Sequence, residues 1–267
     1  MLTALRNLFG SRHEPHRPSV PDGTRYYVVG DIHGRLDLFE ALIKAIEKDD
    51  AASPDADTHI ILLGDLVDRG ADSAGVIKRA RKWQKKRNVR VLAGNHEEMF
   101  LQAFEKPDIL RHFLKHGGRE TIMSYGVSKK QFNAMTLEEL FEFLPKLISK
   151  KERDYIASFE EMIVAGDYLF VHAGIDPSKP IEAQKRGDLL WIRDRFLSHQ
   201  GPLEKVVVHG HTIFDEVEDC GYRIGIDTGA FRSGVLTALV LEGTDRRVIQ
   251  TSEQDGQIEV GSLREAA

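Results

Sequence analysis

Residues 26–34 read YYVVGDIHG, an apolar run that passes directly into a glycine, an aspartate and a histidine. Apolar runs of this length without alternation are typical of strands buried on both faces of a sheet. The same change from an apolar run to glycine and polar residues recurs at residues 60–65, 89–97, 168–174, 206–211 and 224–229. We therefore expect several buried strands, each followed by a tight loop that carries a polar side chain.

Helical patterns separate the first of these strands. Residues 36–46 carry apolar side chains at helical spacing, residues 74–83 predict a second, basic helix, and residues 110–159 are expected to be mostly helical, with Thr136 as an N-cap. Alternating strands and helices imply parallel βαβ units. After residue 206 the strands follow closely with turn residues between them, which predicts a second, antiparallel or mixed sheet. The expected fold class is α/β, with two packed mixed β-sheets flanked by helices.

The length of 267 residues suits one sizeable α/β domain. Residues 10–23 contain three prolines and few apolar groups, which indicates a flexible linker. The expected organisation is a flexible N-terminal arm and linker at residues 1–23, a catalytic domain at 24–255 and a flexible C-terminal tail at 256–267.

The amino-acid composition makes several kinds of partner and cellular environment less expected for this chain. The net charge is −5, so nothing global favours nucleic acid as a partner, and the basic run at residues 78–90 is expected to be a solvated helix face with Trp83 packed inward. Cys220 is the single cysteine, which excludes a disulfide within the chain and indicates a reducing, cytoplasmic environment. No apolar run approaches the ~20 residues that span a bilayer, so stable membrane insertion is not expected. The sequence does not indicate an oligomeric state.

The predicted strand ends carry side chains of metal-ligating types. Loops at the carboxyl ends of strands are where α/β sheets bind ligands. An Asp-x-His pair in an extended segment points both side chains to one side, so Asp31 and His33 can share a cation. A central carboxylate such as Asp65 could bridge two ions about 3.5–4 Å apart, and oxygen ligands mixed with imidazole suit Mn²⁺, Fe or Zn²⁺. The full set is Asp31, His33, Asp65, Asn95, His172 and either His209 or His211, between which spacing does not choose.

Each of these residues has a plain structural explanation when it is taken alone. Asn95 suits a helix N-cap, and His172 suits a satisfied core histidine. Compatible ligands at five separate strand ends are improbable by chance, which favours metal-dependent hydrolysis of a phosphate ester. An aspartic peptidase would explain Asp227-Thr228-Gly229, but the chain has one copy of that motif. A catalytically inactive binding scaffold would be indicated by absent hydrolysis of p-nitrophenyl phosphate with Mn²⁺.

Five motifs resemble, in order, the signature of the phosphoprotein phosphatases, which are calcineurin-like metallophosphoesterases. The resemblance runs from about residue 26 to 241 and is strongest to bacterial and phage lambda-type serine/threonine protein phosphatases. It implies a four-layer α/β/β/α sandwich, two divalent metal ions, most often Mn²⁺, and a phosphoprotein or phosphorylated small molecule as substrate. The motifs are GDIHG at residues 30–34, GDLVDRG at 64–70, GNHE at 94–97, HAG at 172–174 and GHT at 210–212.

The resemblance also implies residue roles. One metal would be held by Asp31, His33 and Asp65. The second would share Asp65 and add Asn95, His172 and His211. His211 is favoured over His209 because it lies in the matching Gly-His-Thr tripeptide. His209 would then support a ligand or serve in packing, and Asp227 would be placed to hydrogen-bond a ligand histidine.

The same comparison implies the catalytic groups. His96 would donate a proton to the leaving alkoxide and Asp68 would orient it. Arg69 and Arg193, with Asn95, would bind the phosphate, and Arg195 is the alternative to Arg193. The runner-up function is symmetrical diadenosine tetraphosphate hydrolysis or another small-molecule phosphatase activity. That hydrolase group resembles this chain less well, because it lacks the acid at Asp68 and has aspartate where this chain has Glu97.

Overall fold

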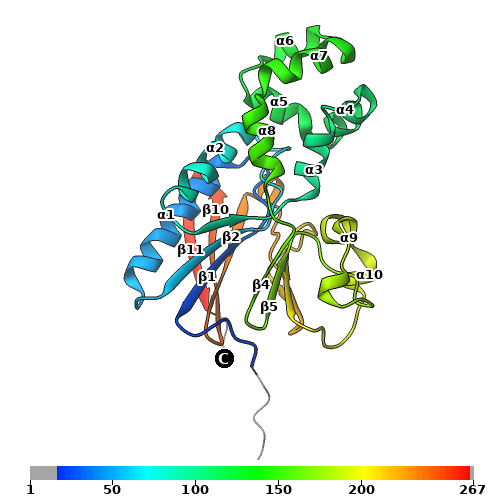
Figure 1. Cartoon of the computed structure of the whole chain (residues 1–267). Coiled ribbons are helices and arrows are strands. Elements are labelled where there is room, and N and C mark those ends of the chain that lie inside the picture. Colours follow the sequence, from blue (N-terminus) through cyan, green and yellow to red (C-terminus); the bar gives the residue numbers. More distant parts are fainter. Residues whose placement is uncertain (1–16, 265–267) are drawn as a thin grey trace, which may run out of the picture.

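The computed structural model describes residues 17–264, which form two packed β-sheets with helices outside (Figure 1). In the first sheet β1 (Thr24–Val29), β2 (Asp57–Leu62) and β3 (Val89–Val91) run parallel, and the antiparallel strands β9 (Val235–Glu242), β10 (Asp245–Gln254) and β11 (Gln257–Arg264) continue it beyond β1. The second sheet has the order β4-β5-β6-β8-β7, in which β5, β6 and β8 are parallel. Its bounds are β4 (Met162–Ala165), β5 (Tyr168–Val171), β6 (Val206–His209), β7 (Glu218–Asp219) and β8 (Arg223–Gly225).

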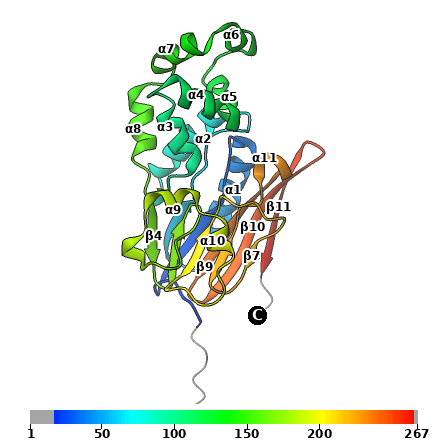
Figure 2. The ribbon, with the colours of Figure 1, turned by 90° about the vertical axis from the view of Figure 1, so that its right-hand side faces the viewer.

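Successive side chains of β1 point alternately into two different apolar cores, which shows how the layers stack. Tyr27 and Val29 belong to the apolar core under the helices α1 (Leu36–Ala52) and α2 (Ser73–Gln84). Tyr26 and Val28 belong to the core between the two sheets. A third core packs the second sheet against α9 (Arg186–Trp191) and α10 (Asp194–Leu197), on the opposite outer face (Figure 2). The predicted α/β/β/α sandwich is therefore confirmed.

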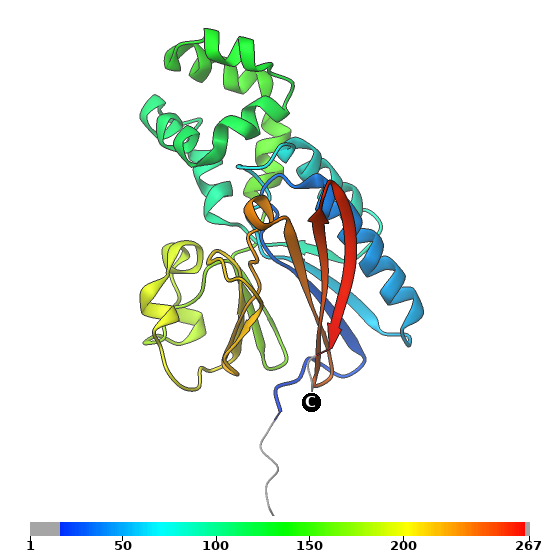
Figure 3. The same cartoon turned by 180° about the vertical axis from the view of Figure 1, so that it is seen from behind.

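A helical segment connects β3 to β4 and rises above the sandwich (Figures 1 and 3). The expected N-cap is present, because the Thr136 side chain accepts a hydrogen bond from the backbone N–H of Glu139 at 3.1 Å. The segment comprises α3 (Asn95–Gln102), α4 (Pro107–Phe113), the π-helical turn η1 (Leu114–Gly118), α5 (Arg119–Ser124), α6 (Lys129–Ala134), α7 (Leu137–Leu147) and α8 (Lys150–Ala157). Two short elements occur later, the 3-10 turn η2 (Ile181–Ala183) and α11 (Ala230–Ser233).

The structure corrects three expectations. The strands after residue 206 do not form one sheet, since β6 to β8 join the second sheet and β9 to β11 extend the first. The tail at 256–267 was expected to be flexible, which is wrong for Gln257–Arg264, because this strand pairs along its whole length with β10. Residues 17–23 of the expected linker pack on the domain, where Val20 is buried and its N–H donates to Gly243. The rest of the arm, residues 1–16, lies outside the described residues, among which no helix is long and apolar enough to cross a membrane.

Candidate metal centre

The loops after six parallel strands meet at one edge of the two sheets. The loops after β1, β2 and β3 come from the first sheet, and those after β5, β6 and β8 come from the second. Parallel strands end at the same edge, which is why residues far apart in the sequence become neighbours here. Every candidate ligand and proton-transfer residue on these loops is buried: Asp31, His33, Asp65, Asp68, Asn95, His96, His172, His209, His211 and Asp227.

Backbone strain is concentrated at this edge. His33, Asp65 and His211 have positive φ angles of 46°, 48° and 63°, in the left-handed region that non-glycine residues rarely adopt. Asp68 and Arg69 adopt it consecutively, at 74° and 69°. Among the described non-glycine residues, the sole other example lies in the β10–β11 turn. Such strain costs free energy and persists where the surroundings hold it for a functional reason.

Two glycines allow the carboxylates to approach the backbone. A Cβ atom on Gly94 would lie 2.1 Å from Oδ1 of Asp65, and one on Gly210 would lie 2.1 Å from Oδ1 of Asp31. Any side chain at either position would displace the carboxylate. The glycines of the GNHE and GHT motifs are thus required by the position of the acids.

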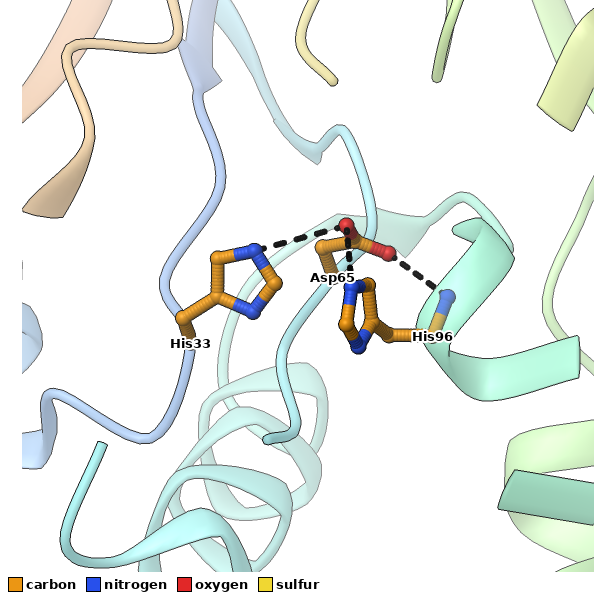
Figure 4. A group of neighbouring side chains, drawn as sticks. All are labelled: His33, Asp65 and His96. Carbon is orange, nitrogen blue, oxygen red and sulfur yellow. Dashed lines mark hydrogen bonds and ion pairs between the residues drawn. The ribbon is translucent and has the colours of Figure 1, made fainter. Parts of the chain in front are cut away.

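His33, Asp65 and His96 form one group of potential metal ligands (Figure 4). The Nε2 atoms of His33 and His96 lie 3.5 and 4.0 Å from Oδ2 of Asp65. The backbone N–H of His96 donates to the other carboxylate oxygen at 3.0 Å. His33 Nδ1 is 2.8 Å from the carbonyl of Val67, so Nδ1 carries the proton and Nε2 presents its lone pair to the carboxylate.

Asp65, His172 and His211 form a second group. His172 Nδ1 lies 2.9 Å from the carbonyl of Leu63, which leaves Nε2 as an acceptor 3.5 Å from Oδ1 of Asp65. Oδ1 of Asn95 lies 3.0 Å from His172 Nε2 and 2.8 Å from His211 Nδ1. Asp65 therefore belongs to both groups, as expected of a bridging carboxylate.

The donor set fits divalent cations. Lone pairs of buried acceptors face one another, and Oδ1 of Asp31 and Nε2 of His211 are buried without a hydrogen-bond partner. Burial, together with the charges of Asp227 and Asp65, raises the pKa of Asp31 well above its ordinary value. Burial lowers the pKa of His33 to about 3 and that of His211 to about 2, so both imidazoles are neutral. Buried acceptors without donors are satisfied by metal ions.

Asp31 lies at the centre but outside both groups of potential ligands. Its Oδ2 accepts the backbone N–H of His211 at 3.0 Å, and its Oδ1 is 4.0 Å from Nδ1 of His172. The first group contains His96 in place of Asp31. It therefore differs from the set predicted for the first metal, which was Asp31, His33 and Asp65.

His96 and Asp68 form a buried pair beside the first group. His96 Nδ1 lies 2.6 Å from Oδ2 of Asp68. Burial opposes protonation of His96, but the carboxylates of Asp65 and Asp68 outweigh it and raise the pKa of His96 above its ordinary value of 6.5. The imidazole is thus suited to hold a proton next to the centre.

Arginines approach from both sides. Arg69 Nη1 lies 2.9 Å from His33 Nε2 and its Nη2 lies 2.9 Å from His96 Nε2. Arg193 donates to the carbonyl of His211 at 3.3 Å. Arg195 instead pairs with Asp188 at 2.7 Å and Asp176 at 3.3 Å, away from the centre. Of the two alternatives, Arg193 is the one beside a candidate ligand.

His209 lies among aromatic side chains, whereas Asp227 lies beside a candidate ligand. His209 packs against Phe196 and Phe214, belongs to neither group, and has a pKa lowered to about 4 by burial. Asp227 lies beside Asp31 and accepts the backbone N–H of Gly229 at 2.8 Å. The expected hydrogen bond from Asp227 to a ligand histidine is not among those of the described residues.

Three supporting contacts were not predicted. Glu97 accepts backbone N–H groups of Gly94, Asp65 and Leu66 at 2.8–2.9 Å and so fixes the Asp65 loop. Its spacing from Gly94 is that of a capping box, a signal that the sequence contains. Phe231 stacks on the Arg69 guanidinium at 4.5 Å. Thr121 bonds to Asp68, and no pattern in the sequence indicates it.

Residues 24–230 match the family model described as calcineurin-like phosphoesterase. The chain belongs to this family. Serine/threonine-protein phosphatase 2 of Salmonella typhimurium is 30% identical to this phosphoesterase, over 79% of the chain and 90% of the relative. The asymmetrical bis(5'-nucleosyl)-tetraphosphatase PrpE of Oceanobacillus iheyensis is 27% identical, over 79% of the chain and 86% of the relative. A crystal structure of a cold-active protein tyrosine phosphatase shares the fold, with a TM-score of 0.56 and 20% identity over 91% of this chain and 81% of that one.

Proposed function

We propose that this phosphoesterase is a serine/threonine protein phosphatase that depends on two divalent cations, with Mn²⁺ as the metal. The carrying observation is the 2.6 Å contact that Asp68 makes with His96, a member of the first group of potential ligands. Hydrolysis of a serine or threonine phosphate releases an alkoxide, which needs a proton in the transition state. A buried imidazole whose pKa is raised by carboxylates is suited to supply it.

The ligands divide between two cations that share Asp65. When bound, the cations supply an activated water and neutralise the charge of the phosphoryl oxygens. The first would be held by Asp31, His33 and Asp65, and the second by Asp65, Asn95, His172 and His211. Carboxylate, amide and imidazole donors without a thiolate favour Mn²⁺, with Fe or Zn²⁺ as the alternatives.

Arg69 would bind the phosphate and release His96 at the same time. In the structure its guanidinium donates to Nε2 of both His33 and His96, which requires both imidazoles to be neutral. Phosphate oxygens are stronger acceptors for this planar fork. Phe231 stacks on the guanidinium and keeps its plane. If the Arg69 guanidinium exchanged its hydrogen bonds to the two imidazoles for hydrogen bonds to the phosphate, Nε2 of His96 would be free to carry the proton for the leaving group.

Arg193 and the Asn95 amide would complete the phosphate site from the other side. Arg193 extends from the segment after α9 toward the carbonyl of His211. Arg69 belongs to the loop after β2. Two guanidinium groups on opposite sides would hold three phosphoryl oxygens in one orientation, which positions the ester for in-line attack.

A second candidate is hydrolysis of a bis(5'-nucleosyl) tetraphosphate, because relatives with that name match 79% of the chain. In that reaction the leaving group is itself a phosphate, which departs with less need of a proton than an alkoxide. The His96–Asp68 pair therefore favours a protein substrate or a phosphorylated small molecule with an alcohol leaving group.

We also propose a cytoplasmic location, since the free Cys220 is exposed and suits a reducing compartment.

The test compares substrates at equal enzyme concentration. Protein reconstituted with Mn²⁺, Fe or Zn²⁺ is assayed with phosphoserine and phosphothreonine peptides and with diadenosine tetraphosphate. The proposal expects the highest kcat/KM on a phosphopeptide with Mn²⁺. A strong preference for the dinucleotide would assign the second function instead.

A further inference from the structure

Thr121, on α5, contacts the carboxylate of Asp68 on the side opposite His96. Its Oγ1 donates to Oδ1 of Asp68 at 2.6 Å, while Oδ2 of the same carboxylate lies 2.6 Å from His96 Nδ1. Both contacts are short, in the range of hydrogen bonds to a carboxylate. Thr121 and Asp68 are fully buried, so no solvent competes for these positions.

The other contacts of the Thr121 hydroxyl leave its proton available to donate to Asp68. A hydroxyl has one proton and two lone pairs. Oγ1 accepts the backbone N–H of Asp68 at 2.8 Å and lies 2.9 Å from Oγ of Ser73, whose proton can point to it. With both lone pairs used, the single proton of Thr121 is left for Asp68. The hydroxyl therefore holds one residue at two points, its backbone and its carboxylate.

This double contact is placed where the backbone needs support. Asp68 and Arg69 are consecutive non-glycine residues in the left-handed region. The N–H of Arg69 donates to the carbonyl of Gly117 at 3.1 Å, and Oγ of Ser124 accepts the N–H of Ala74 at 3.0 Å. A Cβ on Gly117 would lie 2.6 Å from the Arg69 nitrogen, so this approach needs glycine. The helical segment thus holds the loop at Asp68 and Arg69, and it holds the first turn of α2 at Ala74.

We propose that Thr121 is a positioning residue that sets the orientation of the Asp68 carboxylate and, through it, of the His96 imidazole. The inference rests on the proposed role of His96 as proton donor. The helix α5 lies outside both sheets and supplies no candidate ligand. Through Thr121 it would nevertheless take part in the reaction. Loss of the hydroxyl would leave the carboxylate free to rotate and would misdirect His96 Nε2 from the leaving group.

The readout is the dependence of kcat on the leaving group. A phenyl phosphate ester needs proton donation, whereas 2,4-dinitrophenyl phosphate releases a stable anion and needs little. Thr121→Val is expected to lower kcat on phenyl phosphate by about 10–100-fold, the range for losing a hydrogen bond that orients an active group. On the dinitrophenyl ester it should remain within about threefold of the unaltered enzyme, and Thr121→Ser should restore phenyl phosphate turnover.

Two further variants make the result decisive. Thr251→Val removes a buried threonine hydroxyl that bonds to the Leu38 carbonyl rather than to the Asp68 loop, and it should not alter the leaving-group dependence. Ser73→Ala keeps Thr121 but removes a hydroxyl that contacts Thr121 Oγ1 and also accepts the backbone N–H of Asp68, each at 2.9 Å. It should give a smaller change in the same direction, which preserves the test if Thr121→Val fails to fold.

His96→Asn, measured in parallel, separates the role of His96 as proton donor from the role of Thr121 in positioning. If His96→Asn shows the leaving-group dependence while both Thr121→Val and Ser73→Ala lack it, Thr121 has no positioning role. If His96→Asn itself lacks the dependence, the assignment of His96 as proton donor fails, and the inference about Thr121 fails with it.

Discussion

The two sheets contribute differently to the centre. Loops of the first sheet bring the carboxylates of Asp31 and Asp65 and the His96–Asp68 pair. Loops of the second sheet bring the imidazoles of His172 and His211, while the carboxyl of Asp227 lies beside Asp31. Four of the five strained non-glycine residues at the centre also belong to the first sheet. Charge and strain are concentrated on one side, and the other side supplies neutral ligands.

This difference indicates which side must be held most firmly. The Asp65 loop is fixed by Glu97, and burial together with the charge of Asp65 raises the pKa of Glu97 to about 7. The Asp68 loop is fixed by Thr121 and Gly117. Both supports come from the helical segment that follows β3. We therefore expect substitutions on the first side to have larger effects than substitutions on the second.

The largest effect is expected for Asp65→Asn, because Asp65 belongs to both groups of ligands. The substitution removes the shared negative charge and should release both cations, with a loss of activity beyond the ~10²–10⁴-fold expected for a general acid. Elemental analysis of the purified variant measures the metal. Retention of both ions with near-normal turnover would show that Asp65 is not the bridge.

His96→Asn should be next, with kcat on a phosphoserine peptide lowered ~10²–10⁴-fold and the metal content unchanged. Because the carboxylates raise the pKa of His96, its protonated form is present below that pKa and is lost as pH rises through it. The kcat of the unaltered enzyme should accordingly fall on an alkaline limb above pH 6.5, the ordinary value, and the variant should lack this limb. A variant that loses one cation would make His96 a ligand rather than an acid.

A smaller effect on metal affinity should distinguish His211 from His209, which lie just after and at the end of β6 in the second sheet. His211→Ala should weaken metal binding by roughly 10–100-fold, since it removes one neutral ligand and no charge. His209→Leu should leave metal affinity unaltered, because its ring packs between Phe196 and Phe214 and its Nε2 has no hydrogen-bond partner. Titration of Mn²⁺ by calorimetry compares the two. Equal losses would place His209 at the metal.

The smallest effect is expected for the exposed arginines. Arg193→Ala should raise KM for a phosphopeptide about tenfold, the lower end of what a hydrogen bond to a charged group contributes. Arg195→Ala is the matched control, because its guanidinium is engaged by Asp188 and Asp176. Steady-state kinetics on both variants would reverse the assignment if Arg195→Ala had the larger KM.

The sequence indicated where the strands end, but not how the strands are ordered in the two sheets. Apolar runs that end in glycine and a ligand identify strand ends, and parallel strands bring such ends together, so Asp31, Asp65 and His172 could be placed at one edge. The order of strands depends instead on long-range packing, which local patterns do not encode. For this reason β9 and β10 were assigned to the wrong sheet, and β11, with several polar residues, was taken for a tail.

The supporting residues show the same limit. Glu97 lies three residues after Gly94, within reach of a local capping pattern. Thr121 lies 53 residues after Asp68 in a helical segment, where a threonine has no distinguishing neighbour. Its role follows from the way α5 packs on the Asp68 loop. Contacts of this kind are visible in the fold alone.

The most direct test of the central claim is an anomalous diffraction map from crystals grown with Mn²⁺. We predict two peaks on either side of the Asp65 carboxylate, one next to Asp31 and His33 and the other next to Asn95, His172 and His211. A single peak coordinated by His33, Asp65 and His96, or no peak beside Asp65, would contradict it.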